Sequence, residues 1–355
     1  MCDMRRLLWG VGFSFLILIL TLFVVVFVTF FGRGKTPPIA GMHSIATLET
    51  APIGGVEQWL LIRGADTSKP ILLFLHGGPG MPSMFLAHAF QRELEKHFVV
   101  VQWDRRGAGK SYGAGKDVAS INVRQLLNDT FEVTELLRRR FVQDRIYLVC
   151  HSWGTYLGLL AIHEHPEYYS AYVGMGQIAG ESAQVHAIQR EFVLGRANEG
   201  HDTDVMSCLA SETAIVDEDL LFRYHAELYR AASFWPILAE GLRAPEYTFR
   251  DALNVKRGAN KVNRAMKYNV EPRLLNGEIG QFDIPIFLFL GRHDYNAPSS
   301  LAAEYLERLR APQKRLVWFE ESAHFPFYEE KEKFTTEMVR VDESAREYWA
   351  EAGRR

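Results

Sequence analysis

Short apolar runs recur along the chain after residue 70. They occupy positions 71–75, 98–103, 146–150, 171–175, 284–290 and 315–319. Continuous runs of this length are typical of strands buried on both faces of a parallel sheet. Helical patterns lie between most of them. This alternation predicts an α/β fold, with a mainly parallel central sheet and helices on both of its faces.

Three further patterns surround the predicted sheet. Residues 45–63 alternate apolar and polar positions around Pro52-Ile53-Gly54-Gly55, which predicts a β-hairpin. A helix is predicted from Asn122, a good N-cap residue that has Gln125 three positions later. Residues 181–276 carry mixed helical patterns and no strand-like run, which predicts a helical cap inserted over the edge of the sheet.

The N-terminal region is strongly apolar. Residues 7–32 contain no charged side chain, and as a helix they would measure about 39 Å, against roughly 30 Å for the hydrocarbon core of a bilayer. They predict a single transmembrane anchor. A cleaved signal peptide is the alternative, although its apolar region usually has only about 7–15 residues. Basic residues flank the run on both sides, so their balance favours an extracytoplasmic catalytic domain only slightly.

The expected organisation follows from these patterns. A tail at 1–6 precedes the anchor at 7–32, and a linker rich in proline and glycine occupies 33–43. The α/β core comprises 44–180 and 277–355, and the cap comprises 181–276. A chain of 355 residues accommodates one large domain with such an insertion.

Composition narrows the possible partners. The formal net charge is -3, and no face-long run of Lys and Arg indicates a nucleic-acid partner. Three cysteines are too few and too scattered for a disulfide framework or a zinc site. His163 and His165 diverge on a helix, so no metal is predicted. No phosphate-binding loop is present, and no cofactor is expected. The oligomeric state is left open.

A candidate nucleophile lies in the segment Cys150-His151-Ser152-Trp153-Gly154. It follows the strand predicted at 146–150 and precedes a helical run at 155–163. A strand, a sharp turn and a helix are what a nucleophile elbow requires, with Ser152 at the turn. Cys150 stands where glycine is usual. The alternative is a serine in an ordinary turn between strand and helix.

A glycine-rich turn, His76-Gly77-Gly78-Pro79-Gly80, follows the strand predicted at 71–75. It can bring backbone N–H groups close to the elbow. The N–H of Gly78, or alternatively of Gly77, would form an oxyanion hole with the N–H of Trp153. A simple tight turn is the alternative. The segment 104–111 is interpreted as a structural loop near the rim of the site.

Asp294 and His324 complete a predicted catalytic triad with Ser152. Asp294 follows the strand predicted at 284–290, and His324 follows the strand predicted at 315–319. Their order along the chain, Ser, Asp, His, is that of α/β hydrolases. His324 would take the proton of Ser152, and Asp294 would orient the imidazole. Singly, each could be a helix cap or a packed loop residue.

In combination, these motifs resemble the proline iminopeptidase family. The resemblance covers roughly residues 70–330 and also includes Trp103-Asp104, Arg106-Gly107, Gly109 and Gly291-Arg292-His293. It implies an α/β hydrolase with a helical cap that releases an N-terminal residue, often proline, from small peptides. It further implies acidic cap residues that hold the free amine and an apolar pocket for the first side chain.

Four cap residues are candidates for substrate binding under this resemblance. Glu181 and Glu191 are candidates for the amine, and Trp235 or Phe249 for the apolar pocket. Solvated helix charges and cap packing are the alternatives.

Two other functions remain open. An esterase, lipase or lactonase would use the same triad on acyl esters, which an anchor would suit if the substrates are lipid-like. A membrane-tethered binding protein that has lost catalysis belongs to a different class. Epoxide hydrolases are excluded, because they attack with an Asp at the elbow position that Ser152 occupies here.

Overall fold

The structure is a computed structural model, and it describes residues 14, 16–21, 23, 33–115, 117–211, 214–266 and 280–353. Most of the predicted anchor at 7–32 therefore lies outside the described residues, as do the tail at 1–6 and the expected end of the cap at 276. In the part of the chain that is described, no helix is both long and apolar enough to cross a membrane.

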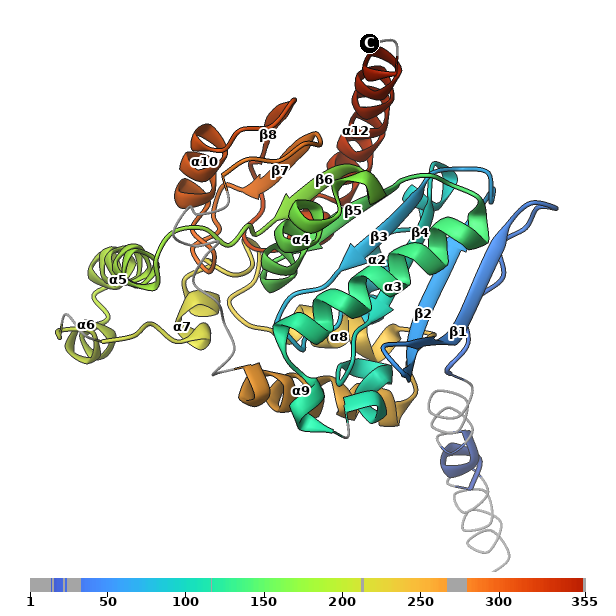
Figure 1. The fold of residues 1–355 in the computed structure, drawn as a ribbon. Coiled ribbons are helices and arrows are strands. Elements are labelled where there is room, and N and C mark those ends of the chain that lie inside the picture. The colour runs from blue at the N-terminus through green and yellow to red at the C-terminus, as the bar shows by residue number, and fades with distance from the viewer. Residues whose placement is uncertain are drawn as a thin grey trace, which may run out of the picture.

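A single eight-stranded sheet organises the molecule (Figure 1). The strand order is β1-β2-β4-β3-β5-β6-β7-β8, and the strands from β4 to β8 are all parallel. The predicted α/β fold with a mainly parallel sheet is confirmed. The strands are β1 (Ile45–Ile53), β2 (Val56–Gly64), β3 (Ile71–Leu75), β4 (Val99–Asp104), β5 (Ile146–His151), β6 (Tyr169–Met175), β7 (Ile286–Gly291) and β8 (Lys314–Phe319).

The hairpin at the start of the sheet is formed by β1 and β2. These strands pair antiparallel from Ile45 opposite Gly64 to Ile53 opposite Val56. Gly54 and Gly55 make the turn between them with positive φ angles of 56° and 74°. Two consecutive positive φ values match the right-handed twist of a hairpin.

Helices flank the sheet on both sides. Their bounds are α2 (Ala87–Phe90), α3 (Val123–Phe141), α4 (Trp153–Glu164), α5 (Ser182–Glu199), α6 (Thr203–Cys208), α7 (Glu218–Arg223), α8 (Trp235–Arg243), α9 (Phe249–Met266), α10 (Ser299–Arg308), α11 (Pro326–Glu329) and α12 (Lys331–Ala352). Short 3₁₀ segments lie at Met84–Leu86, Leu94–Lys96, Gly109–Gly115, Val118–Ser120 and Pro166–Tyr168.

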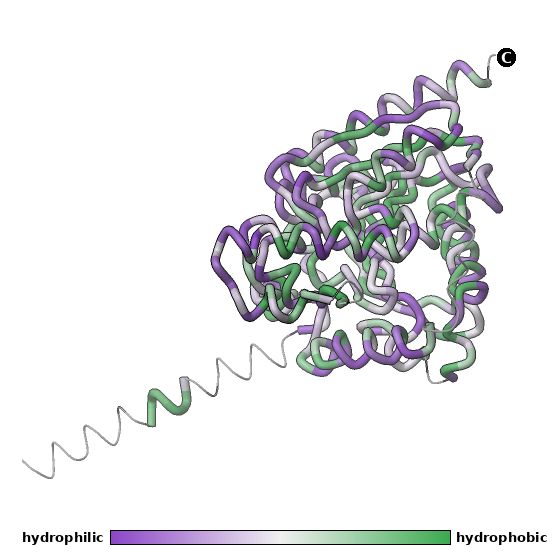
Figure 2. Tube along the Cα trace, turned by 90° about the vertical axis from the view of Figure 1, so that its left-hand side faces the viewer, coloured by the Kyte–Doolittle hydropathy of each residue, from purple (hydrophilic) through white to green (hydrophobic). Residues whose placement is uncertain are grey.

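Each strand feeds two cores because successive side chains point to opposite faces. Leu73 and Leu148 pack with apolar residues of α3, α4 and α10 on one face. Leu72 and Val149 pack with α2, α11 and α12 on the other. The long C-terminal helix α12 alternates between apolar and polar positions as it covers the sheet (Figure 2), as an amphipathic helix must.

The helices α5 to α9 lie between β6 and β7 in the chain. Residues of α5, α6 and α7 form a small apolar cluster of their own that includes Val193, Val205 and Leu221. Ile237 of α8 and Tyr247, just before α9, instead join the core on the α12 side of the sheet. This part of the chain is therefore packed onto the sheet through α8 and α9.

A buried ion pair ties the loop after β4 to α3. Arg106 donates from Nε and Nη2 to the two carboxylate oxygens of Asp129, each at 3.0 Å, and both side chains are almost fully buried. Asp129 also accepts a hydrogen bond from Gln58 of β2. The pair thus joins the hairpin, the loop and the helix.

Replacing Asp129 with Ala should destabilise the fold strongly. The change leaves the Arg106 guanidinium buried without a carboxylate, which typically costs about 3–5 kcal/mol. Equilibrium urea unfolding measures the loss. Glu93→Ala is the matched control, because it breaks an exposed pair with Lys96 that should be worth at most about 1 kcal/mol. Equal losses in the two variants would contradict a structural role for the buried pair.

Candidate active site

A cavity of about 420 Å³ opens where several parallel strands end. Gly78 follows β3, Ser152 and Trp153 follow β5, and His324 comes from the loop after β8; all four line this cavity. The carboxyl ends of the strands are where open α/β sheets bind ligands.

The strand, turn and helix predicted around Ser152 are present. β5 ends at His151 and α4 begins at Trp153, and Ser152 between them has a φ of 52°. Such a positive φ is strained for a residue with a Cβ. The turn is also crowded, because a Cβ on Gly154 would lie 2.3 Å from the carbonyl oxygen of Leu75. Only glycine fits two positions after the serine.

Cys150 occupies the place before the elbow where glycine is usual. Its side chain is fully buried, and Gly158 of α4 makes room for it, since a Cβ there would lie 2.3 Å from the Cys150 Sγ. Burial raises the pKa of the Cys150 thiol well above its usual value. The thiol is therefore neutral and acts as a small packing group.

Asp294 and His324 form a buried hydrogen-bonded pair. The Nδ1–H of His324 donates to Oδ2 of Asp294 at 2.9 Å, and Oδ1 of Asp294 accepts from the N–H of Ala297, also at 2.9 Å. This arrangement leaves Nε2 of His324 as the nitrogen that can take a proton. Among the described residues no hydrogen bond joins Ser152 to His324, although both face the same cavity; such contacts often tighten only when a substrate binds.

Two residues that the sequence did not single out position His324. His151 donates its Nε2–H to the carbonyl oxygen of His324 at 2.8 Å, and burial lowers the pKa of His151 well below its usual value, so its ring stays neutral. Gly176, just after β6, lies against the His324 ring, and a Cβ there would be 2.6 Å from Cε1. The position of His151 beside Ser152 was the only sequence signal for either.

The glycine-rich turn after β3 passes directly beside the serine. A Cβ on Gly77 would lie 2.7 Å from Cβ and 3.3 Å from Oγ of Ser152. Gly78, with a φ of 106°, lines the cavity next to Trp153, the first residue of α4. The helix N-terminus leaves the Trp153 N–H without an intrahelical partner. The predicted donors Gly78 and Trp153 therefore border one side of the cavity.

A buried arginine holds this turn in place. Arg105 is 1 % exposed, and its Nη2 donates to the carbonyl oxygens of His76, Gly77 and Pro79. The guanidinium also lies over the Trp153 ring, 5.3 Å from its centroid. Burial lowers the pKa of Arg105 to about 9, so the side chain stays charged at neutral pH. The loop interpreted as structural thus carries a cation that contacts both sides of the candidate oxyanion hole.

His76 completes this contact as a neutral acceptor. Burial, and then the charge of Arg105, lower the pKa of His76 well below its usual value. Its Nδ1–H donates to the carbonyl oxygen of Gly77 at 2.9 Å, and its Nε2 accepts from the backbone N–H and Nε of Arg105, each at 3.3 Å.

The lining of the cavity also includes acidic residues. Glu227, in the segment between α7 and α8, is 2 % exposed, and its Oε2 has no hydrogen-bond partner among the described residues. Burial raises the pKa of Glu227 to about 8. Glu218, at the start of α7, lines the same cavity with a more exposed side chain, and partial burial raises its pKa.

These carboxylates act on His324. Burial disfavours its protonation, but the charges of Asp294, Glu227 and Glu218 outweigh burial and raise the pKa of His324 to about 9. The backbone N–H of His324 also donates to the carbonyl oxygen of Glu227 at 3.1 Å. The carboxylates therefore favour the protonated imidazole, and a positive ligand or a loss of negative charge would lower the pKa of His324.

The four predicted substrate residues do not reach this cavity. Glu181 caps α5 in a capping box with Gln184, and Glu191 is exposed on the same helix. The side chains of Trp235 and Phe249 are 63 % and 51 % exposed. The apolar lining instead comes from Met81, Phe85, Leu86, Leu221, Phe234, Ile237, Phe325 and Phe327.

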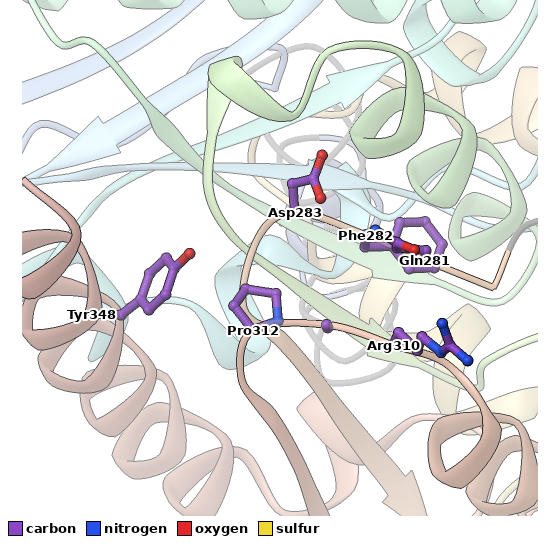
Figure 3. A pocket seen from close by; sticks show the side chains of 7 residues that line it. Gln281, Phe282, Asp283, Arg310, Pro312 and Tyr348 are labelled. Atoms are coloured by element: carbon purple, nitrogen blue, oxygen red, sulfur yellow. The ribbon is translucent and has the colours of Figure 1, made fainter. Parts of the chain in front are cut away.

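A second depression lies at the other edge of the sheet (Figure 3). It has a volume of about 480 Å³, and its walls include Phe282 before β7, Pro312 before β8 and Tyr348 of α12. This edge carries the amino ends of the strands, opposite to the edge where ligands bind in open α/β sheets. We therefore assign the candidate active site to the first cavity.

The fold and the site define an α/β hydrolase. Residues 72–337 match the model of the alpha/beta hydrolase family, and the chain belongs to that family. The predicted resemblance to proline iminopeptidases is also confirmed.

Relatives of known name support this resemblance. The chain is 29 % identical over 308 residues to "Probable aminopeptidase YbaC" of Bacillus subtilis, covering 84 % of this chain and 96 % of that protein. It is 26 % identical over 293 residues to a proline iminopeptidase of Clostridioides difficile, covering 80 % and 93 % of the two chains.

Solved structures agree on the fold. A proline iminopeptidase of Mycobacterium smegmatis superposes with a TM-score of 0.60 at 16 % identity, over 84 % of this chain and 98 % of that chain. A membrane phospholipase A described as a bacterial virulence factor gives 0.61 at 17 % identity, over 96 % and 99 %. At these identities the likeness concerns the fold alone.

Replacing Arg105 with Gln should lower turnover of a short acyl ester by about 10²-fold, comparable to losing one oxyanion donor, with little change in KM. Gln is too short to hold all three carbonyl oxygens, so the glycine turn loses its support. Steady-state kinetics measure the effect, with exposed Arg92→Gln as control. Affinity for a boronic acid, whose adduct carries an oxyanion, should fall in parallel, whereas product inhibition should not. Wild-type turnover and boronate affinity in Arg105→Gln would contradict this role.

Proposed function

We propose that this protein is a membrane-anchored serine hydrolase that releases N-terminal residues from small peptides. The observation that carries the proposal is one cavity whose lining combines Ser152 and His324 with the cap carboxylates Glu227 and Glu218. A free N-terminal amine fits the carboxylates, and the adjacent peptide carbonyl then faces the serine.

The reaction proceeds through an acyl-enzyme on Ser152. His324 accepts the Ser152 proton at Nε2 while Oγ attacks the carbonyl carbon, and the oxyanion accepts hydrogen bonds from the N–H groups of Gly78 and Trp153. His324 then protonates the leaving amine as the C–N bond breaks. A water molecule, deprotonated by His324, hydrolyses the ester and frees Ser152. Asp294 orients the imidazole throughout.

The amine has a second effect in this mechanism. Glu227 and Glu218 raise the pKa of His324, which disfavours its role as a base. An ammonium group held by Glu227 cancels part of that negative charge and favours the neutral imidazole. Binding of a free-amine substrate thus favours the neutral His324 imidazole that acts as the base in the reaction. Glu227 and Glu218 take the place that Glu181 and Glu191 held in the sequence prediction.

The anchor is part of the same proposal. The uncharged run at 7–32 is long enough to span a bilayer, and the basic residues around it slightly favour a catalytic domain outside the cytoplasm. The protein is thereby assigned to a membrane, with small peptides as its substrates.

An esterase or lipase is the second candidate function. It is favoured by the apolar part of the cavity, where Phe85, Leu86 and Phe234 offer a surface for an acyl chain. The same serine, histidine and oxyanion donors would act on an ester, and the cap carboxylates would then have no ammonium to bind.

A matched substrate panel tests the proposal. Free-amine Pro, Ala and Leu arylamides should be hydrolysed faster than their N-blocked forms and than short acyl esters. Ser152→Ala should abolish turnover and labelling by a fluorophosphonate probe, and Asp294→Asn should lower turnover by about 10⁴-fold. Turnover of esters alone would establish the second candidate. No turnover and no labelling of the wild type would indicate a binding protein.

Replacing Glu227 with Gln should shift the pH dependence of ester hydrolysis. The raised pKa of His324 keeps it protonated to higher pH, so the base form is lost as pH falls through that pKa. Removing one negative charge lowers this pKa, and the acid limb of kcat/KM for an uncharged acyl ester should move to lower pH. Free-amine arylamides should lose kcat/KM at the same time. Glu191→Gln is the control, and an unmoved acid limb in Glu227→Gln would contradict the coupling.

A further inference from the structure

The outward face of α8 and α9 exposes large apolar side chains. On α8, Trp235 is 63 %, Leu238 45 % and Leu242 43 % exposed, and on α9 Leu253 is 43 % exposed. The three α8 residues are spaced by three and four positions, so they lie on one side of the helix. A concentration of exposed apolar residues on neighbouring helices is unusual for a surface that faces only water.

The opposite sides of the same helices face the catalytic cavity. Ile237 of α8, Ala259 and Asn263 of α9, and Phe234 just before α8 line the cavity that contains Ser152. These two helices are therefore a wall with the active site on one side and an apolar surface on the other.

The exposed charges along α9 are all positive. Arg250, Lys256, Arg257 and Arg264 are exposed along α9. The acidic residues of the described stretch 235–264 are buried or paired with cations: Glu246 is buried, Asp251 pairs with Lys110, and Glu240 pairs with His88 and Arg243. Exposed Trp and Leu beside Lys and Arg are typical of helices that lie on an anionic lipid surface.

The wall is fastened to the chain that follows the predicted anchor. The N–H groups of Gly34 and Lys35 donate to the carbonyl oxygen of Pro245, between α8 and α9, at 2.9 and 3.3 Å. Thr36 donates from Oγ1 to Glu246 at 3.0 Å. Only one residue separates Gly34 from the uncharged run at 7–32. Figure 1 shows α8 and α9 at the end of the molecule opposite the C-terminus.

We propose that the outward face of α8 and α9 docks onto an anionic lipid bilayer. The surface consists of Trp235, Leu238, Leu242 and Leu253 with the α9 cations, and the occupant is the membrane that holds residues 7–32. The inference rests on the anchor in the proposed function. Because the contacts of residues 34–36 leave a connection of only one residue, an anchored chain holds this wall at the membrane surface, with the catalytic cavity directly behind it.

The experiment places a solvent-sensitive probe on the wall of the full-length protein. Leu238→Cys is labelled with the fluorophore NBD, and Val142→Cys, at a residue 91 % exposed, is the matched control. Cys2 and Cys208 are replaced by Ser in both proteins, and the buried Cys150 is kept. The proteins are reconstituted into vesicles of phosphatidylglycerol and phosphatidylcholine. The emission at 238 should shift to the blue and be quenched several-fold more by spin-labelled lipids than the emission at 142.

Lipid charge and flotation separate the possible failures. Quenching at 238 should weaken in pure phosphatidylcholine and in the variant Lys256→Glu/Arg257→Glu. A protein that floats with the vesicles while its probe at 238 stays in water overturns the docking and leaves the anchor standing. A protein that does not float overturns both, whereas the hydrolase assignment depends only on the substrate panel. A blue shift that disappears as protein is diluted into lipid identifies a second copy as the occupant and also overturns the proposal.

Discussion

The candidate active site depends on how closely the turns after β3 and β5 approach each other. A Cβ on Gly154 would collide with the carbonyl oxygen of Leu75, and a Cβ on Gly77 would collide with Ser152. This contact brings the glycine turn to the serine and the first N–H of α4 to the same side of the cavity. Ser152 has a positive φ, which is strained. The close packing of the two turns holds the backbone in this conformation.

Charge is distributed unevenly around this contact. The buried cation Arg105 lies behind the candidate oxyanion hole, where it donates to backbone carbonyl oxygens; within the described part of the chain it pairs with no carboxylate. The negative charges of three carboxylates, Asp294, Glu227 and Glu218, act on the imidazole of His324. A developing oxyanion is therefore placed toward positive charge and a cationic ligand toward negative charge. In a cavity with low dielectric both effects are stronger than in water.

The sheet and the placement of Ser152, Asp294 and His324 near one another could be predicted from the sequence because they depend on local patterns. Buried parallel strands are continuous apolar runs, and residues that follow such runs meet at one edge of the sheet, which places Ser152, Asp294 and His324 together. The cap could not be predicted in the same detail. Glu181 caps α5 and Glu191 lies on it; this helix packs with α6 and α7, and no local pattern states which side of it faces the sheet. Glu227 lies in an irregular segment with no periodicity to interpret, and Arg105 in a loop whose burial only the tertiary structure reveals.

The same irregular segment joins the cap to the loops that carry Asp294 and His324. The carbonyl oxygen of Ala226 accepts from the N–H of Tyr295, and that of Glu227 accepts from the N–H of His324. Glu329 binds the N–H groups of Tyr229 and Ala323 through its two oxygens. The segment is therefore hydrogen-bonded to the loops that carry Asp294 and His324, and α8 begins a few residues after it. These hydrogen bonds connect the position of this cap segment to the geometry of Asp294 and His324.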